Sequence, residues 1–168
     1  MVPGAMVIVL MGVSGTGKTE VGTRLAQALG GTFVEGDDYH PKANVEKMRS
    51  GVPLDDADRQ PWLETLSREI SAWLEAGRTM VLACSALKQR YRDILKAGRP
   101  DVRFVHLEGD PDLIRERLAG RRGHYMPASL LDSQFAALEK PADAITVGID
   151  ATPDAIVAEI CKALDSAS

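Results

Sequence analysis

The sequence predicts an α/β fold in which a five-stranded, mostly parallel sheet is flanked by helices. Three observations lead to this prediction. Apolar runs of strand length recur along the chain, helical patterns lie between them, and a glycine-rich loop joins the first run to the first helix. At 168 residues the chain suits one domain covering residues 1–168, because a chain of this length can bury a sizeable core.

Five apolar runs rich in Val, Ile, Leu and Met have the length of β-strands. They cover residues 6–13, 32–37, 79–86, 102–109 and 144–149. The run at 32–37 is the weakest of them. Because most of the runs are apolar on both faces, they indicate strands covered by helices on each side, as in parallel sheets.

Helical patterns separate these runs. They cover residues 18–29, 61–76, 87–97, 111–119 and 153–164. Several begin with proline or an acidic residue and stop at glycine, as the chemistry of helix ends predicts. On this basis the second helix is expected to begin at Pro61.

Two segments, about 38–60 and about 120–138, interrupt the alternation of strands and helices. The first is polar, charged and rich in turn residues, and the second opens with a basic stretch and continues with a helix-like pattern. Loops at one edge of a rigid scaffold commonly carry function. We therefore expect a substrate-binding insertion at 38–60 and a lid at 120–138.

Charge and cysteine content exclude several classes of protein. The net charge of −4 and the pI near 5.4 argue against a general affinity for nucleic acid, whose binders carry a basic surface. Cys84 and Cys161 belong to no CxxC or Cys/His group, so neither a disulfide framework nor a zinc site is indicated.

The apolar run at 5–13 is too short to span a bilayer and has no basic segment before it. We expect a cytoplasmic protein with no nucleic-acid or membrane partner.

Residues 12–19 read GVSGTGKT and match the phosphate-binding pattern GxxxxGK[ST] between a predicted strand and a predicted helix. The glycines let backbone N–H groups point inward, and the helix N-terminus adds positive potential. Lys18 then reaches the β- and γ-phosphates, and the Thr19 hydroxyl ligates magnesium. The alternative, a glycine-rich turn with an exposed lysine, is disfavoured by the strand and helix context. The residues expected to bind the nucleotide are Gly12, Ser14, Gly15, Thr16, Gly17, Lys18 and Thr19.

The carboxylates of the site are expected from residues 35–41, which read EGDDYHP. The third predicted strand ends without a carboxylate, and a guanine-reading NKxD motif is absent, which weakens the interpretation as a switch GTPase. In an extended segment Glu35 and Asp37 share a face while Asp38 points away. One carboxylate can orient magnesium, directly or through water, and the other can accept the proton of a substrate hydroxyl.

The same stretch allows plainer interpretations. Asp37 and Asp38 also suit the N-cap of a helix that starts at Pro41. His40 is either a satisfied polar residue or a substrate contact.

Basic residues gather in both insertions. Arg117 and Arg121 are four positions apart and share a helical face if the helix persists, with Arg122 and His124 just beyond. A guanidinium can stack on a purine or hold a phosphoryl oxygen; the alternative is a solvated basic helix end. Further cations would suit an anionic acceptor, although each alone is more often a surface charge: Lys42, Lys47, Arg49, Arg59 and Lys88.

Four segments together resemble, in chain order, the hallmark segments of the gluconokinase family of small P-loop kinases. They read MGVSGTGKT, GDDYHPKANVEKMRSGVPLDDADRQPWL, CSALKQRYRDIL and GRRGHYMPASLLDSQFAALEKP. The resemblance runs over nearly the whole chain. It implies a fold similar to shikimate and adenylate kinases, and the magnesium-assisted transfer of the γ-phosphoryl group of ATP to the primary hydroxyl of D-gluconate. The family is commonly dimeric, so a homodimer is an option that the composition does not test.

The resemblance also implies roles for individual residues. Catalytic roles fall on Asp37, Lys18 and Arg121; contacts with the sugar acid on Asp37, His40, Arg59, Lys88, Arg122 and His124; and magnesium on Thr19 and Glu35. Arg117 would lie against adenine and Arg121 near the phosphates. Family members often read Asp-Gly-Asp where this chain has Glu35-Gly36-Asp37, which favours a water-mediated role of Glu35. The alternatives are a kinase for another small anionic acceptor, such as shikimate or a nucleoside monophosphate, and a non-metabolic nucleotide switch.

Overall fold

The structure, a computed structural model, describes residues 5–119 and 128–166, with the side chains of residues 128–130 left out. Its centre is one five-stranded sheet in which every neighbouring pair of strands is parallel. The strands are β1 (Met6–Met11), β2 (Thr32–Glu35), β3 (Thr79–Ala83), β4 (Val102–Glu108) and β5 (Ile145–Gly148), in the spatial order β2-β3-β1-β4-β5. The predicted α/β fold class is confirmed.

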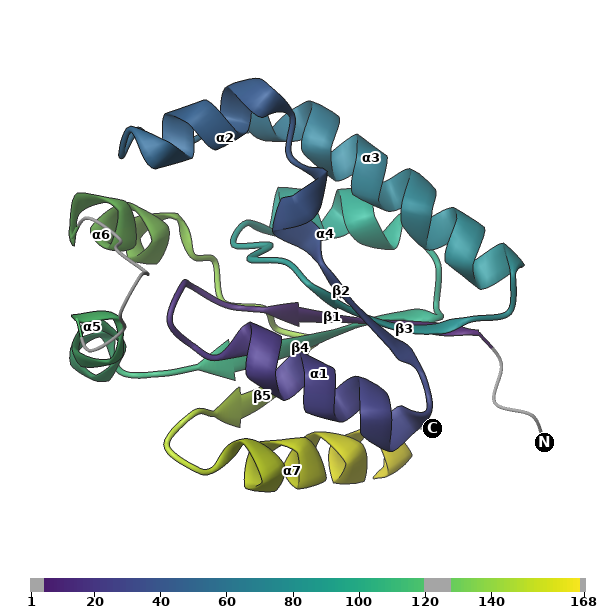
Figure 1. The fold of residues 1–168 in the computed structure, drawn as a ribbon. Coiled ribbons are helices and arrows are strands. Elements are labelled where there is room, and N and C mark those ends of the chain that lie inside the picture. Colours follow the sequence, from purple (N-terminus) through teal and green to yellow (C-terminus); the bar gives the residue numbers. More distant parts are fainter. Residues whose placement is uncertain (1–4, 120–127, 167–168) are drawn as a thin grey trace.

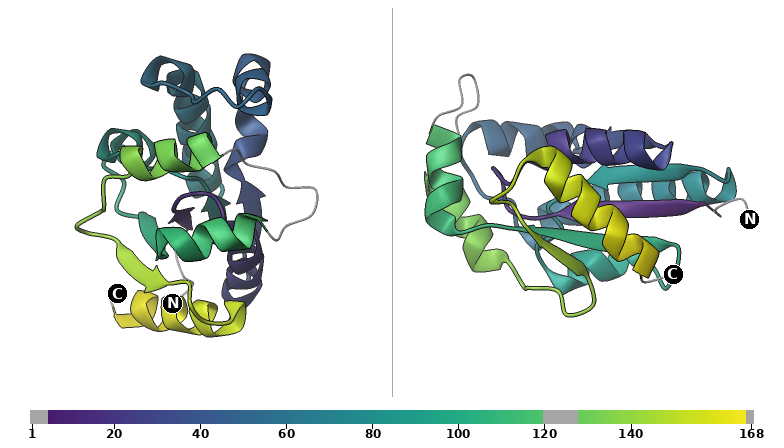
Figure 2. Two further views of the ribbon diagram at one scale, coloured as in Figure 1. Left: turned by 90° about the vertical axis from the view of Figure 1, so that its left-hand side faces the viewer. Right: turned by 90° about the horizontal axis from the view of Figure 1, so that it is seen from below.

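Helices cover both faces of this sheet (Figure 1). They are α1 (Lys18–Leu29), α2 (Lys42–Arg49), α3 (Asp56–Glu75), α4 (Gln89–Lys96), α5 (Pro111–Ala119), α6 (Ala128–Ala137) and α7 (Pro153–Ser166), with a 3₁₀ turn η1 (Gly36–Tyr39). α1 and α7 pack on one face, and α3 and α4 on the other. α5 and α6 lie beyond the carboxyl ends of the strands, and Figure 2 shows them from that side.

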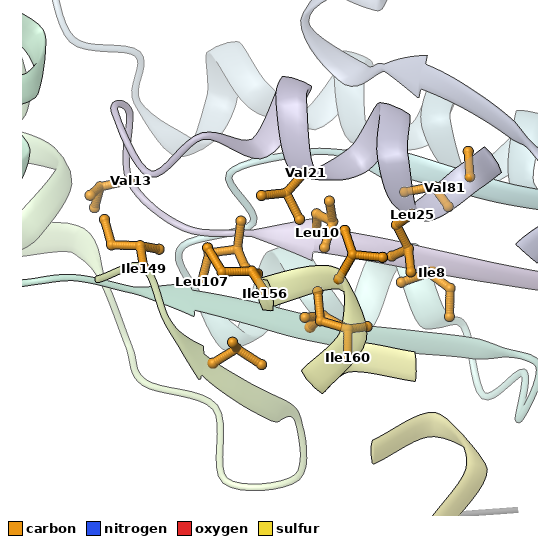
Figure 3. Packing of buried hydrophobic residues seen from close by; sticks show 14 of the residues in the cluster. Ile8, Leu10, Val13, Val21, Leu25, Val81, Leu107, Ile149, Ile156 and Ile160 are labelled. Carbon is orange, nitrogen blue, oxygen red and sulfur yellow. The ribbon is translucent and has the colours of Figure 1, made fainter. Parts of the chain in front are cut away.

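The core consists of two apolar clusters, one on each face of the sheet. Successive side chains of a strand point to opposite faces, so β1 contributes to both clusters. Ile8 and Leu10 pack with side chains of α1 and α7, such as Leu25 and Ile160 (Figure 3). Val7, Val9 and Met11 pack against α3 and α4. This double burial explains why β1 reads as a continuous apolar run.

Helix α3 begins earlier than the sequence predicted. The expected start was Pro61, but the helix begins at Asp56, with Asp55 as its N-cap. A capping box stabilises this start: Asp58 N donates to Asp55 Oδ1 (2.7 Å), and Asp55 N donates to Asp58 Oδ2 (3.0 Å). These bonds satisfy N–H groups of the first turn, so the helix forms ahead of the proline and includes it.

The carboxyl edge of the sheet gathers the segments that follow the strands. Because all the strands are parallel, the loop after β1, the turn η1 after β2 and the segment after β3 meet at this edge, where ligands bind in open α/β sheets. α6 lies between α5 and the helices α2 and α3 in Figures 1 and 2. Among the described residues, no helix has the length and apolar character needed to cross a membrane.

Candidate active site

The glycine-rich loop between β1 and α1 depends on its glycines for close packing. Gly12 and Gly15 have positive φ angles of 148° and 86°. A Cβ atom on Gly15 would lie 2.9 Å from Ile114 Cγ2 and 3.0 Å from Leu118 Cγ, both on α5. The loop therefore fits against α5 only with glycine at this position.

Lys18 lies across this loop. Its ammonium donates to the carbonyls of Gly12 (2.8 Å) and Val13 (3.0 Å). The buried Thr16 hydroxyl donates to the same Val13 carbonyl at 3.1 Å. Together with the N-terminus of α1, this places positive charge and backbone N–H groups where a phosphate chain can bind.

Gln134 on α6 holds the other side of the loop. The Ser14 backbone N–H donates to Gln134 Oε1 at 2.7 Å, and Gln134 Nε2 donates to Ser14 Oγ at 3.1 Å. The predicted lid segment thus reaches the phosphate-binding loop directly. Sequence reasoning missed this residue, because a single glutamine inside a helical pattern carries no spacing signal.

Thr19 and Glu35 meet where the start of α1 faces the end of β2. The Thr19 hydroxyl donates to Glu35 Oε2 at 2.7 Å. Partial burial raises the pKa of Glu35, helped by the charge of Asp37, while the bond from Thr19 and the charge of Lys18 act in the opposite direction. A hydroxyl and a carboxylate are ligands that suit magnesium, which commonly keeps several waters and binds substrate phosphates. Within the described part of the chain, no three or more His, Cys, Asp or Glu residues gather as a metal site.

Asp37 and His40 come together because η1 turns the chain directly after β2. The expected extended conformation holds at Glu35 but not beyond, since residues 36–39 form a 3₁₀ turn. Glu35 and Asp37 nevertheless line one cleft, and Asp38 does not. Burial acts to raise the pKa of Asp37, but nearby His40 and Lys18 outweigh it, so this pKa lies below its usual value.

The alternative role of Asp37 and Asp38 as helix caps is wrong. Pro41 occupies the N-cap position of α2, and no side chain caps this helix. Asp38 thus has neither the capping role nor a place in the cleft. Gly36, between the two acids of the site, is needed for packing, because a Cβ there would lie 2.5 Å from the Ala83 carbonyl oxygen of the neighbouring strand.

His40 is held by aromatic stacking and by hydrogen bonding. Its ring stacks on Trp62 of α3 with centroids 4.0 Å apart and an interplanar angle of 18°. Trp62 Nε1 in turn donates to the Gly36 carbonyl at 2.8 Å. Asn44 Nδ2 lies 3.2 Å from His40 Nδ1. The other ring nitrogen, Nε2, lies 3.6 Å from Asp37 Oδ1.

One cleft of about 180 Å³ connects these groups. Its wall combines the phosphate-binding loop, the insertion and α6. Arg59 brings a guanidinium into this wall. The residues with polar side chains in the wall are Ser14, Lys18, Glu35, Asp37, His40, Arg59, Trp62, Ser85, Ser133 and Gln134.

Only one of the basic residues Arg59, Lys88 and Lys47 lines the cleft. Arg59 lines the cleft and donates to the Leu54 carbonyl (2.7 Å) and the Tyr91 hydroxyl (3.1 Å). Lys88 lines a neighbouring pocket, which Arg59 also lines, and pairs with Asp56 at 3.1 Å. Lys47 pairs with Asp58 at 2.9 Å, which ties α2 to the start of α3.

Arg117 donates to the Ile149 carbonyl at 2.7 Å and so joins α5 to the segment after β5. The remaining predicted residues, Arg121, Arg122 and His124, lie outside the described residues, as does the first part of the predicted lid. The described part of that lid is α6.

Comparison with known proteins assigns the chain to a family. A family model described as an AAA domain matches residues 7–141. The gluconokinase of Gluconobacter oxydans (strain 621H) is 48% identical over 158 residues, which cover 92% of this chain and 89% of the relative. The chain belongs to the gluconokinase family.

Solved structures agree with this family assignment. The crystal structure of a gluconokinase from Sinorhizobium meliloti 1021 matches with a TM-score of 0.86 and 41% identity, over 98% of this chain and 93% of that one. A shikimate kinase from Bacteroides thetaiotaomicron matches with a TM-score of 0.70 at 17% identity, over 95% of this chain and 98% of that one, a likeness of fold alone. The expected resemblance of the gluconokinase family to shikimate kinases is thereby confirmed for the fold.

Proposed function

We propose that this member of the gluconokinase family transfers the γ-phosphoryl group of ATP to the primary hydroxyl of D-gluconate, forming 6-phospho-D-gluconate and ADP. One observation supports this most strongly. A single cleft joins the lysine of the phosphate-binding loop to the Asp37 carboxylate and the Arg59 guanidinium. A binding site for the phosphate donor, an ionised acceptor for a hydroxyl proton and a partner for a carboxylate are the three features that this reaction needs.

In this proposal the donor lies along the glycine-rich loop. Lys18 and the N–H groups at the start of α1 bind its phosphates, and Arg117 lies against the adenine. Thr19 and Glu35 would hold magnesium, with a water-mediated role for Glu35, whose carboxylate also accepts a hydrogen bond from the Thr19 hydroxyl. When bound, the ion would neutralise charge on the phosphates.

The acceptor lies between Asp37 and Arg59. Asp37 accepts a hydrogen bond from the primary hydroxyl, orients it toward the γ-phosphate and takes its proton as the phosphoryl group moves. A carboxylate with a lowered pKa is ionised at neutral pH and ready to accept. Because phosphoryl transfer passes through a loose transition state, orientation counts for more than the strength of the base.

The gluconate carboxylate would pair with Arg59, the cation that the cleft holds on the acceptor side. A guanidinium binds a carboxylate through two parallel N–H bonds, which makes this contact selective for acids over neutral sugars. His40 is proposed as a further residue of the sugar-acid site, beside Asp37. Lys88, which lines the neighbouring pocket, Arg122 and His124 are proposed as further contacts with the sugar acid, and Arg121 would stabilise the transferring phosphoryl group.

An assay of ADP release with a panel of acceptors tests this proposal. With ATP and magnesium, we expect ADP release to depend on gluconate and to be far slower with shikimate, nucleoside monophosphates or neutral sugars. Release that depends on another acid would reassign the acceptor. Release that no acceptor stimulates would favour a nucleotide switch and contradict the proposal.

We also propose a reducing, cytoplasmic setting. Both cysteines are free thiols, and burial raises the pKa of Cys84 to about 12. A thiol with such a pKa stays protonated and unreactive, so Cys84 serves packing and not redox chemistry.

A further inference from the structure

We propose that Asn44 is a positioning residue that fixes the tautomer of His40, with the ring proton on Nε2, so that this N–H group faces the Asp37 carboxylate. The inference deepens the proposed function, on which it rests for the role of Asp37. It depends on a chain of contacts that runs from the start of α3, through α2, to η1.

The first step is the orientation of the Asn44 amide. Asn44 is 3% exposed, and its Nδ2 atom lies 2.8 Å from the backbone carbonyl oxygen of Asp58. A carbonyl oxygen only accepts hydrogen bonds, so the atom facing it must be the amide nitrogen. The orientation of the amide is thus determined by the backbone of α3, independently of His40.

The second step is the histidine ring. The same Nδ2 atom lies 3.2 Å from His40 Nδ1. An amide nitrogen has two hydrogens and accepts none; one hydrogen goes to Asp58, and the other points at Nδ1. Nδ1 must therefore accept, and the proton of the neutral ring lies on Nε2. The hydrogen bond at one ring nitrogen decides the state of the other.

The third step is what Nε2 faces. It lies 3.6 Å from Asp37 Oδ1, which is longer than a hydrogen bond but within reach of a small movement. Hydrogen bonds of catalytic groups are often long before the substrate binds and shorten afterwards. The Nε2–H group can thus hold one carboxylate oxygen of Asp37 and leave the other for the substrate hydroxyl.

His40 and Asn44 are both held firmly enough to orient the Asp37 carboxylate. The His40 side chain is 3% exposed and stacks on the buried Trp62, whereas the Asp37 side chain is 67% exposed in the open cleft. Asp58, which directs Asn44, is itself held by the capping box with Asp55. The mobile member is therefore the carboxylate, and the rigid member is the N–H donor that orients it.

The tautomer can be read directly by NMR. The chain has three histidines, so the ring nitrogens of His40 can be assigned in ¹H–¹⁵N spectra by comparison with the variant His40→Gln. We expect an unprotonated Nδ1 and a protonated Nε2 at neutral pH. A proton on Nδ1 of the wild-type protein would overturn the inference, whatever the acceptor proves to be.

Two variants test the consequence for catalysis. Asn44→Leu removes the donor, and we expect mixed tautomers and a kcat with gluconate lowered about tenfold or more, as for other residues that orient a catalytic group, with KM for ATP unchanged. The matched control Lys47→Met loosens the same contact between α2 and α3 without touching His40. It should leave the tautomer unchanged and kcat within about twofold. Equal loss of kcat in both variants would show a merely structural role and contradict the inference.

A second pair of variants needs no change at Asn44. In His40→Gln the amide nitrogen can take the place of Nε2 and donate to Asp37. The shorter side chain of His40→Asn reaches only the place of Nδ1, where its oxygen accepts from Asn44, and leaves Asp37 without this donor. We expect the glutamine variant to keep about tenfold more of kcat than the asparagine variant. Similar values in the two would count against the inference. If no acceptor stimulates ADP release in the wild type, the proposed function fails, while the NMR result still decides the tautomer.

Discussion

Asp37 and Asp38 are neighbours in the chain with the same chemistry, and the fold separates their roles. The 3₁₀ turn after β2 directs Asp37 into the cleft beside His40 and leaves Asp38 outside it. Arg59 and Lys88 both line the neighbouring pocket, but only the Arg59 guanidinium also lines the cleft, while the Lys88 ammonium pairs with Asp56. The first pair therefore offers a functional candidate and a matched control.

Asp37→Asn should lower kcat by about 10²- to 10⁴-fold, the usual contribution of a general base, because the amide cannot accept the hydroxyl proton. Binding of ATP, measured by titration without acceptor, should be nearly unchanged. Asp38→Asn is the control, with a kcat expected to stay near that of the wild type. A parallel loss of ATP affinity in Asp37→Asn would instead indicate a structural residue.

Arg59→Met should raise KM for gluconate by roughly 10- to 100-fold, since hydrogen bonds to charged groups are worth about 1.5–3 kcal/mol. KM for ATP should change little. Arg90→Met removes an exposed arginine that pairs with Asp56 and does not line the cleft, and should have little effect on either constant. If the two variants behave alike, Arg59 does not bind the acceptor; thermal unfolding of both checks that they fold.

At the scale of elements, the site depends on how α5 and α6 contact the phosphate-binding loop. α5 packs on Gly15, and α6 reaches Ser14 through Gln134. Arg115 of α5 and Asp132 of α6 form an ion pair at 2.7 Å, which joins the two helices. A nucleotide bound in the loop would therefore meet both helices at once.

Gly15→Ala should weaken ATP binding and destabilise the fold, because its added Cβ would collide with Ile114 and Leu118 and its φ angle is positive. Gly98→Ala is the matched control: its φ of 71° is also positive, but nothing lies within 4 Å of the added atom. The control should lose only about 1–2 kcal/mol of unfolding free energy and keep its ATP affinity. Equal losses of stability and affinity in the two variants would mean that contact with α5 is unimportant.

At the scale of the whole molecule, the parallel sheet buries a histidine that has no part in the proposed reaction. His106 in β4 is 2% exposed, next to the central strand β1. Burial lowers the pKa of His106; nearby Glu108 opposes this shift, and Arg92 and Lys140 reinforce it. The folded protein therefore binds this proton less readily than the unfolded chain does.

This shift makes folding stability depend on pH. Above the unfolded pKa of about 6.5 the neutral histidine carries no penalty, and as the pH falls below that value the unfolded chain gains protons first and is favoured. Urea unfolding at pH 8 and pH 5.5 should therefore show a larger loss of stability on acidification in the wild type than in His106→Leu. The same loss in both proteins would assign the effect to other groups.

The sequence by itself determined the α/β class, the strands and most of the helices, and the phosphate-binding loop. It also pointed to EGDDYHP as the source of the carboxylates. These features are local: apolar period, helix ends and glycine spacing act within a few residues of each other. A local pattern also marks the start of α3, since Asp55 and Asp58 have the spacing of a capping box. The predicted boundary was wrong because it followed the rule that places proline at the first helical position.

Only the tertiary structure decided which of the candidates share a cleft. The sequence predicted that Glu35 and Asp37 share a face, on the assumption of an extended chain. They do line one cleft, but it is the turn η1 that places Asp37 beside His40. Asn44 and Gln134 had no signal at all, because their roles depend on partners from distant parts of the chain: Asp58 of α3, and Ser14 of the loop after β1. Such contacts follow from strand order and helix packing, which bring separate segments to one edge of the sheet, and no local pattern encodes them.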